Sequence, residues 1–365
     1  MKLLLAGDVM PGRGIDQIQL APAPAVLHER FCTSALDYVA LAERRNGPIP
    51  RRVAPAYIWG DALEEVAALA PDLRLVNLEC AVTLSQDAWP KGINYRMNPA
   101  NLPCVTAAGI DCCVLANNHV LDWGIQGLTD TVDALTNAGI ATAGAGRNAE
   151  DAAKPAILSP QSGAGRLVVH AAACPSSGVP PEWAAQGMRP GVHFVTGRLD
   201  ATVRDLAGRI AQGRQPGDIV AVSIHWGSNW GYEIDEEMRA FAHFLIDEAG
   251  ADLVHGHSSH HPRAVELYRD RAIFYGCGDL INDYEGISGH EGFRSELVLV
   301  HLLSLHPDGS FAGLEMLPYR LRHFRLNQAE EADRRWLADR MNRECHRFGA
   351  GVVLLPDGRL ALRRR

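Results

Sequence analysis

Six side chains that commonly bind divalent metal ions stand at or just after the ends of five apolar segments. They are Asp8, Glu79, Asn118, His225, His257 and His260. Because α/β proteins bind ligands beyond the carboxyl ends of their strands, we expect these side chains to meet at one site. All six offer oxygen or nitrogen and none is a thiolate. Such a set suits two divalent ions, Mn, Fe or Zn, with a bridging carboxylate.

A histidine next to this set has the neighbour that acid–base chemistry requires. His119 follows Asn118 directly and precedes Asp122 by three residues. A carboxylate at this spacing can orient an imidazole and stabilise its charge, so we predict that His119 transfers a proton and that Asp122 positions it. The alternative is that Asp122 only caps the helix that follows.

Further aromatic and cationic residues are candidates for the wall of a substrate pocket. We predict that the substrate contacts Tyr95, Arg96, Trp226, Trp230 and Arg294. His290 lies in a loop rich in polar groups and is a candidate for a second acid–base residue. For the two tryptophans the alternative is simple packing of the loop that carries them.

Alternating strand and helix patterns would position these residues. The sequence predicts strands at 3–6, 73–78, 112–116, 167–171 and 219–224, with another beginning at 252. It predicts helices at 34–45, 61–70, 101–108, 125–138, 199–212 and 235–248. From residue 264 onward, alternating runs separated by turn signals favour antiparallel hairpins, and the last 40 residues favour a helix and then a hairpin. This order is typical of an α/β protein.

The composition excludes several classes of protein. The chain has 365 residues with 47% hydrophobic and 21% charged content, as in ordinary globular proteins. The net charge is −8, and the basic residues form no stripe along the chain, so we expect no nucleic-acid partner. The eight cysteines form no CxxC pair, and no apolar run reaches the ~18 residues that span a bilayer. The first apolar run is too short for a signal peptide, and we therefore expect a cytoplasmic protein.

At these residues the chain resembles the CapA family, the poly-γ-glutamate capsule synthesis accessory proteins, whose fold is similar to that of calcineurin-like metallophosphatases. The matching motifs are Gly-Asp-Val-Met-Pro-Gly-Arg-Gly at 7–14, Asn-Leu-Glu at 77–79, Leu-Ala-Asn-Asn-His at 115–119, Leu-Asp-Trp-Gly at 121–124, Ser-Ile-His-Trp-Gly at 223–227 and Gly-His at 256–257. The resemblance implies a four-layer αββα sandwich of mixed sheets flanked by helices. We expect one domain over 1–325 and an extension, 326–365, packed on it.

The resemblance also implies roles for single residues. Asp8 stands where the metallophosphatase Asp-x-His motif begins, and Glu79 stands where a bridging acid lies. Met10 occupies the place of the histidine in that first motif, which removes one nitrogen ligand. The segment Asn-Leu-Glu at 77–79 replaces the usual Gly-Asp-x-x-Asp-Arg.

Three functions agree with this pattern. The first is a metal-dependent hydrolase or accessory enzyme that acts on a polyglutamate-like or other peptide substrate during synthesis of a capsule or cell-wall polymer. The second is epimerisation at a peptide Cα, with His119 and His290 exchanging the proton. The third is a non-catalytic accessory subunit that binds polymer-synthesis enzymes and keeps the metal site for binding or structure.

Overall fold

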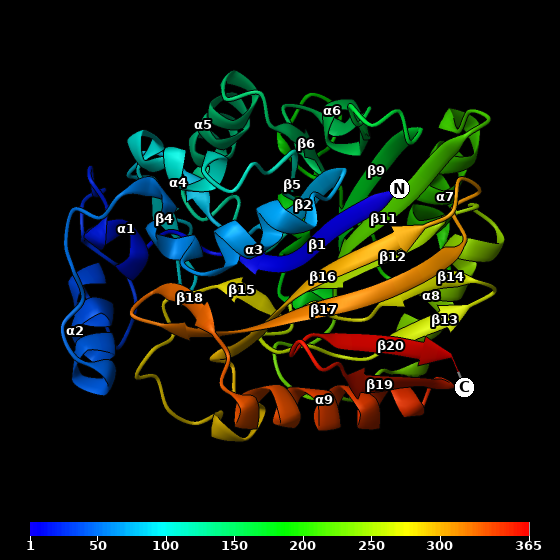
Figure 1. Ribbon diagram of the computed structural model, residues 1–365. Coiled ribbons are helices and arrows are strands. Elements are labelled where there is room, and N and C mark those ends of the chain that lie inside the picture. Colours follow the sequence, from blue (N-terminus) through cyan, green and yellow to red (C-terminus); the bar gives the residue numbers. More distant parts are fainter. Residues whose placement is uncertain (365) are drawn as a thin grey trace.

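Two mixed β-sheets form the centre of the computed structural model, which describes residues 1–364 (Figure 1). The larger has ten strands, and its path runs through β19 (Ala350–Leu354), β20 (Leu360–Arg364), β17 (Phe311–Arg322), β16 (Leu297–Leu305), β1 (Lys2–Val9), β2 (Leu73–Leu78), β5 (Cys112–Val114) and β6 (Ala141–Ala143). Two more strands lie beside this path, β15 (Asp279–Ile281) on β1 and β18 (Arg325–Gln328) on β17. Strands β1, β2, β5 and β6 are parallel, so their carboxyl ends share one edge.

The smaller sheet has six strands and a parallel centre. Its order is β13 (Val265–Tyr268), β14 (Arg271–Phe274), β12 (Leu253–His257), β11 (Asp218–His225), β9 (Arg166–Ala173) and β8 (Ala156–Leu158). The edge strands β13 and β8 are antiparallel to their neighbours. Two short pairs complete the strands, β3 (Ala81–Val82) with β4 (Arg96–Met97) and β7 (Ala145–Gly146) with β10 (Gly191–Val192).

Helices surround the two sheets (Figure 1). They are α1 (Gly14–Ile18), α2 (Ala35–Asn46), α3 (Ala62–Leu69), α4 (Pro103–Thr106), α5 (Gly124–Asn137), α6 (Ala149–Ala153), α7 (Ala201–Gly213), α8 (Glu236–Asp247) and α9 (Glu331–His346). Leu4 of β1 and Val76 of β2 line a small cavity together with Val66 of α3, which places α3 against the large sheet. In Figure 1, α9 lies along the hairpin of β19 and β20.

The alternation of side chains along β9 shows how the layers pack. Leu167 and Val169 belong to the core between the two sheets, whereas Val168 and Ala172 pack in a second core with residues of α7 and α8. Both sides of the strand are therefore apolar, as expected for a strand buried on both faces. The expected four-layer αββα arrangement of the α/β fold is confirmed.

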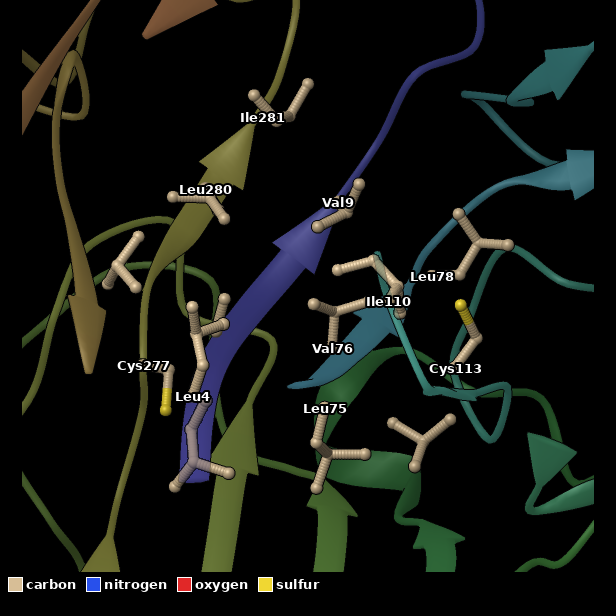
Figure 2. Packing of buried hydrophobic residues seen from close by; sticks show 14 of the residues in the cluster. Leu4, Val9, Leu75, Val76, Leu78, Ile110, Cys113, Cys277, Leu280 and Ile281 are labelled. Carbon is tan, nitrogen blue, oxygen red and sulfur yellow. The ribbon is translucent and has the colours of Figure 1, made fainter. Parts of the chain in front are cut away.

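Strand β15 brings a distant segment against the centre of the large sheet. Figure 2 shows Leu280 and Ile281 on one side of β1 and Val76 on the other. The approach of β15 requires glycine in β1, because a Cβ atom on Gly7 would lie 2.0 Å from the carbonyl oxygen of Gly278. The same pairing sets Asp8 opposite Asp279.

Most of the predicted elements are present, and the differences have local causes. The helix predicted at 101–108 is instead a 3-10 turn, Pro99–Asn101, followed by the short α4. Pro103 lacks the N–H that would continue a helix from residue 99, so the helix begins there. The predicted final helix and hairpin are α9 and β19–β20, and β20 extends the large sheet through β17.

The proposed boundary at residue 325 stays a prediction, and Arg365 lies outside the described residues. All eight cysteines are free thiols. Among residues 1–364, none of the helices combines the length and the apolar character needed to cross a bilayer. The cytoplasmic location stays a prediction.

The close approach of β1 and β15 predicts opposite effects for two glycine substitutions. We expect Gly7→Ala to lower the free energy of unfolding by about 1–3 kcal/mol, because the added methyl group collides with the Gly278 carbonyl. Gly208→Ala is the control, since nothing lies within 4 Å of its Cβ position in α7, and alanine there should raise stability by up to about 1 kcal/mol. Urea denaturation measures both, and equal stability of the two variants would contradict this packing.

Candidate metal centre

The carboxyl ends of parallel strands from both sheets meet at one site. Asp8 lies on β1 of the large sheet, while His225 and His257 end β11 and β12 of the smaller one. The sheets touch just behind these residues, where His255 Nε2 lies 2.9 Å from the carbonyl oxygen of Ala6. The two sheets therefore present their ligand-bearing ends to the same space.

Asp8, His225 and His257 form the first group of metal-ligating side chains. One candidate ligand atom from each lies within 4.8 Å of the other two, and all three residues are buried. His257 Nδ1 lies 2.8 Å from His225 Nδ1 and 3.7 Å from Asp8 Oδ1. Burial, reinforced by neighbouring histidines, holds the pKa of both imidazoles well below its usual range. Both rings are thus neutral, which is the form that binds metals.

A second buried group consists of Asp8, His260 and Asp279, whose candidate ligand atoms also lie within 4.8 Å of one another. His260 Nδ1 is 3.0 Å from Asp279 Oδ1, and the Asn282 amide donates to the other oxygen of Asp279 at 2.8 Å. Burial disfavours the charged form of His260, but the carboxylates of Asp279 and Asp8 together outweigh burial and raise the pKa of His260. Asp8 belongs to both groups and therefore lies where a bridging carboxylate would stand.

Glu79 and Asn118 lie beside the first group. Glu79 Oε1 is 3.8 Å from His225 Nε2, and Asn118 Oδ1 is 3.1 Å from the same nitrogen. The structure thus brings together all six predicted metal ligands, and it adds Asp279 to them.

The electrostatics of the buried carboxylates fit divalent cations. Burial and the neighbouring Asp279 raise the pKa of Asp8 to about 7. Burial and the carboxylates of Asp8 and Asp279 raise the pKa of Glu79 well above its usual range. Three carboxylates that disfavour one another's charge, surrounded by oxygen and nitrogen donors, are a set whose charge a divalent cation would neutralise. The residues present therefore fit a metal centre.

Asp122 fixes the orientation of His119. Asp122 Oδ2 lies 2.6 Å from His119 Nδ1, and the same oxygen accepts the backbone N–H of Tyr95 at 2.6 Å. Lys91 Nζ lies 2.6 Å from Asp122 Oδ1. His119 Nε2 faces Glu79 Oε1 at 3.7 Å. Helix α5 starts after Trp123 without a side-chain cap, so the contacts of Asp122 are those of an orienting carboxylate and not of a helix cap.

His119 is neutral in this environment. Burial lowers its pKa to about 4, and the Lys91 ammonium acts in the same direction, although Asp122 opposes both. With Nδ1–H donated to Asp122, the lone pair of Nε2 is directed toward the metal ligands. The ring is thus arranged to accept a proton on the side where a substrate would lie.

Two of the predicted substrate residues border the centre. The Tyr95 ring packs edge-on against the His119 ring at 4.5 Å, and its hydroxyl lies 3.0 Å from that of Tyr284. The Trp230 ring is 5.2 Å from the His260 ring and stacks on His290 at 4.0 Å. Aromatic rings therefore border the centre at His119 and at His260.

The other predicted substrate residues make contacts within the protein. The Arg96 guanidinium donates to the carbonyls of Ser85 and Pro24 and lies 3.7 Å from the Trp123 ring. Trp226 is buried in the core formed with α7 and α8, and its indole N–H donates to the carbonyl of Tyr275. Arg294 pairs with two carboxylates, Glu296 and Asp333. Their substrate roles stay predictions.

Sequence reasoning missed Asp279 and Lys91 as parts of the centre. For Lys91 the sequence indicates only a cation four residues before Tyr95. A signal for Asp279 was present, because Gly-Asp followed by two apolar residues occurs both at 7–10 and at 278–281. These two segments are the parallel neighbours β1 and β15.

A family model described as "Bacterial capsule synthesis protein PGA_cap" matches residues 2–284. The chain belongs to this family. The matched region contains every residue of the two ligand groups and both His119 and Asp122. The resemblance to CapA proteins that the motifs indicate is thereby confirmed.

Two relatives of this chain are named for roles in polymer synthesis. A probable polyglutamine synthesis accessory protein of Mycobacterium tuberculosis (strain ATCC 25618 / H37Rv) is 48% identical over 361 residues, covering 98% of this chain and 94% of that protein. The PGA biosynthesis protein CapA of Bacillus subtilis (strain 168) is 32% identical over 279 residues, covering 76% of this chain and 62% of that protein.

A solved structure is also similar to this PGA_cap chain. It is the crystal structure of a 5'-nucleotidase precursor from Thermus thermophilus, with a TM-score of 0.43 and 13% identity. It covers 87% of this chain and 54% of the nucleotidase chain. Similarity at this level identifies no activity.

The shared position of Asp8 predicts how metal content responds to substitution. With Mn²⁺ supplied, we expect about two equivalents in the unaltered protein, none in Asp8→Ala and about one in Asp279→Ala, because only Asp8 belongs to both groups. Elemental analysis after gel filtration measures this. Asp339→Ala, on the exposed side of α9, is the control and should keep both equivalents. Equal metal content in Asp8→Ala and Asp339→Ala would contradict the assignment.

Proposed function

We propose that this chain is a metal-dependent hydrolase that cleaves a bond in a polyglutamate-like peptide polymer during its synthesis. The observation that carries the proposal is the pair of buried ligand groups sharing Asp8, next to a histidine oriented by a carboxylate. The names of the relatives, which concern polyglutamine synthesis and PGA biosynthesis, support a polymer of amino acids as the substrate.

The residues of the two groups would hold two divalent cations. His225 and His257 would bind one ion, His260 and Asp279 the other, and Asp8 would lie between them. Glu79 and Asn118 would complete the set beside His225. Bound divalent cations polarise a carbonyl or phosphoryl oxygen and lower the pKa of water.

The residues of the chain supply proton transfer and orientation. His119 accepts a proton at Nε2 and returns it to the leaving group, while Asp122 accepts the Nδ1–H and stabilises the charged ring. Lys91 pairs with the second oxygen of Asp122 at 2.6 Å, which holds that carboxylate in place. The Tyr95 ring packs against His119 and limits access of water to it.

The position of His290 favours hydrolysis over epimerisation at a peptide Cα. Epimerisation needs two acid–base groups on opposite faces of one carbon. His119 is buried among polar partners that orient it, whereas His290 is exposed and is held by stacking on Trp230. A group without an orienting partner is poorly placed to exchange a proton at a fixed carbon.

The proposal predicts separate effects on activity and on metal content. We expect the protein with Mn²⁺ to shorten γ-linked glutamate oligomers, and His119→Ala to reduce the rate by about 10²–10⁴-fold while keeping both metal ions. His346→Ala, at the exposed end of α9, is the matched control and should leave the rate unchanged. Mass spectrometry of the products in deuterated water measures cleavage and Cα exchange together.

Each outcome of this experiment decides between the alternatives. Shortened chains without deuterium at Cα support hydrolysis. Deuterium at Cα in an intact chain would contradict hydrolysis and support epimerisation. No change of the oligomers, with or without His119, would leave an accessory subunit that binds polymer-synthesis enzymes.

A further inference from the structure

A cleft of about 500 Å³ opens beside the metal centre. Its inner end is lined by Trp230, Asn282 and Tyr284. The Tyr284 ring packs edge-on against the His260 ring at 5.1 Å, and the Asn282 amide holds Asp279. The cleft therefore lies beside the second ligand group, with Tyr284 and Asn282 between them.

Two arginines stand at the other end of the cleft. Arg45 lies in the basic last turn of α2, and Arg322 is the last residue of β17. Both line the cleft and are exposed. Neither guanidinium forms an ion pair within residues 1–364, whereas Arg294 and Arg320 of the same cleft both pair with Asp333.

The backbone at this outer end is fixed by one buried carboxylate. Glu285 accepts the backbone N–H of His323 at 2.9 Å and of Phe324 at 2.5 Å, and it also accepts the Asn46 amide. His323 Nε2 lies 2.7 Å from the carbonyl oxygen of Asn46. Because Asn46 follows Arg45 and His323 follows Arg322, these bonds hold together the two chain segments that carry the arginines.

The charges and surfaces of the cleft suit one chemical class of ligand. Glu291 and Glu296 also line it, so a densely charged polyphosphate would meet repulsion there. A peptide chain with spaced carboxylates offers both acceptors for arginine and N–H donors for these glutamates. The stacked rings of Trp230 and His290 provide an apolar wall for its methylene groups.

The volume of the cleft sets the size of ligand that it accommodates. Glu285 follows Asp279 by six residues, so a ligand that reaches from the second ligand group to Glu285 spans at most about 20 Å. A single amino acid or a dipeptide bound at the metal ligands is too short to fill a cleft of this volume.

We infer that Arg45 and Arg322 form a distal carboxylate subsite that makes the protein prefer long chains over short ones. The inference rests on the proposed function, because it places the reacting bond at the metal centre. A chain bound there extends along the cleft and places a side-chain carboxylate between the two guanidinium groups. Binding strength then increases with chain length until the subsite is filled.

Calorimetric titration without added metal tests this subsite apart from turnover. The probes are γ-linked glutamate oligomers of two and ten residues. We expect the double variant Arg45→Gln and Arg322→Gln to bind the longer probe about tenfold more weakly and to bind the dipeptide as before. Arg44→Gln is the control, because it removes the same charge from α2 at an exposed position outside the cleft lining.

Several results would overturn the subsite. They are equal losses in the control and the double variant, equal losses for both probes, and affinity that does not change with length. Tighter binding of polyphosphate than of the longer probe would also overturn it, since the cleft would then be a phosphate site. Length-dependent binding that needs both arginines, without any cleavage of the oligomer, would keep the subsite and reject the proposed hydrolase.

Discussion

The carboxylates of Asp8, Glu79 and Asp279 are buried close together. Their mutual repulsion is the constraint on which the hydrogen bonds and the packing around the site depend. Burial raises the pKa of Asp8 and of Glu79, and the neighbouring carboxylates raise both pKa values further. Hydrogen-bond donors stabilise the Asp8 carboxylate. The Asn77 amide donates to Asp8 Oδ1 at 2.7 Å, and the Ser258 N–H donates to Asp8 Oδ2 at 3.1 Å. These donors hold the Asp8 carboxylate in place without adding a positive charge of their own, which leaves its charge to be balanced by a cation.

Both sheets contribute ligand residues to this centre. The large sheet supplies the carboxylates and the smaller sheet supplies neutral imidazoles. A hydrogen-bonded series behind the ligands joins the sheets, in which Ser223 Oγ lies 2.9 Å from His257 Nε2 and 3.0 Å from His255 Nδ1. His255 in turn reaches the backbone of β1. A polar series of this kind fixes the orientation of a ligand imidazole, so the packing of the sheets and the geometry of the site depend on each other.

The sequence was informative wherever one strand end carried one polar residue. Parallel strands place their carboxyl ends together, so the strands of both sheets could be predicted to present Asp8, His225 and His257 to one region. Asp279 could not be reached in this way, because β15 has only three residues and pairs with a strand more than 200 positions earlier in the chain. Strands of that length leave no periodic pattern to detect.

Adjacency along the chain does not by itself place two side chains on the same side of the structure. Successive side chains of a strand point to opposite faces. His225 faces the metal centre, and the next residue, Trp226, accordingly packs in the core shared with α8. Tyr95 contacts His119, while its neighbour Arg96 turns to Trp123. Residues next to a functional side chain in sequence are thus often its structural support on the other face.

The central proposal is that each of the two ligand groups that share Asp8 would hold a divalent cation. A crystal structure of the protein grown with Mn²⁺, with data collected for anomalous scattering, tests it most directly. The account predicts two anomalous peaks, one beside His225 and His257 and the other beside His260 and Asp279, with Asp8 contacting both. A single peak, or peaks away from Asp8, would contradict it.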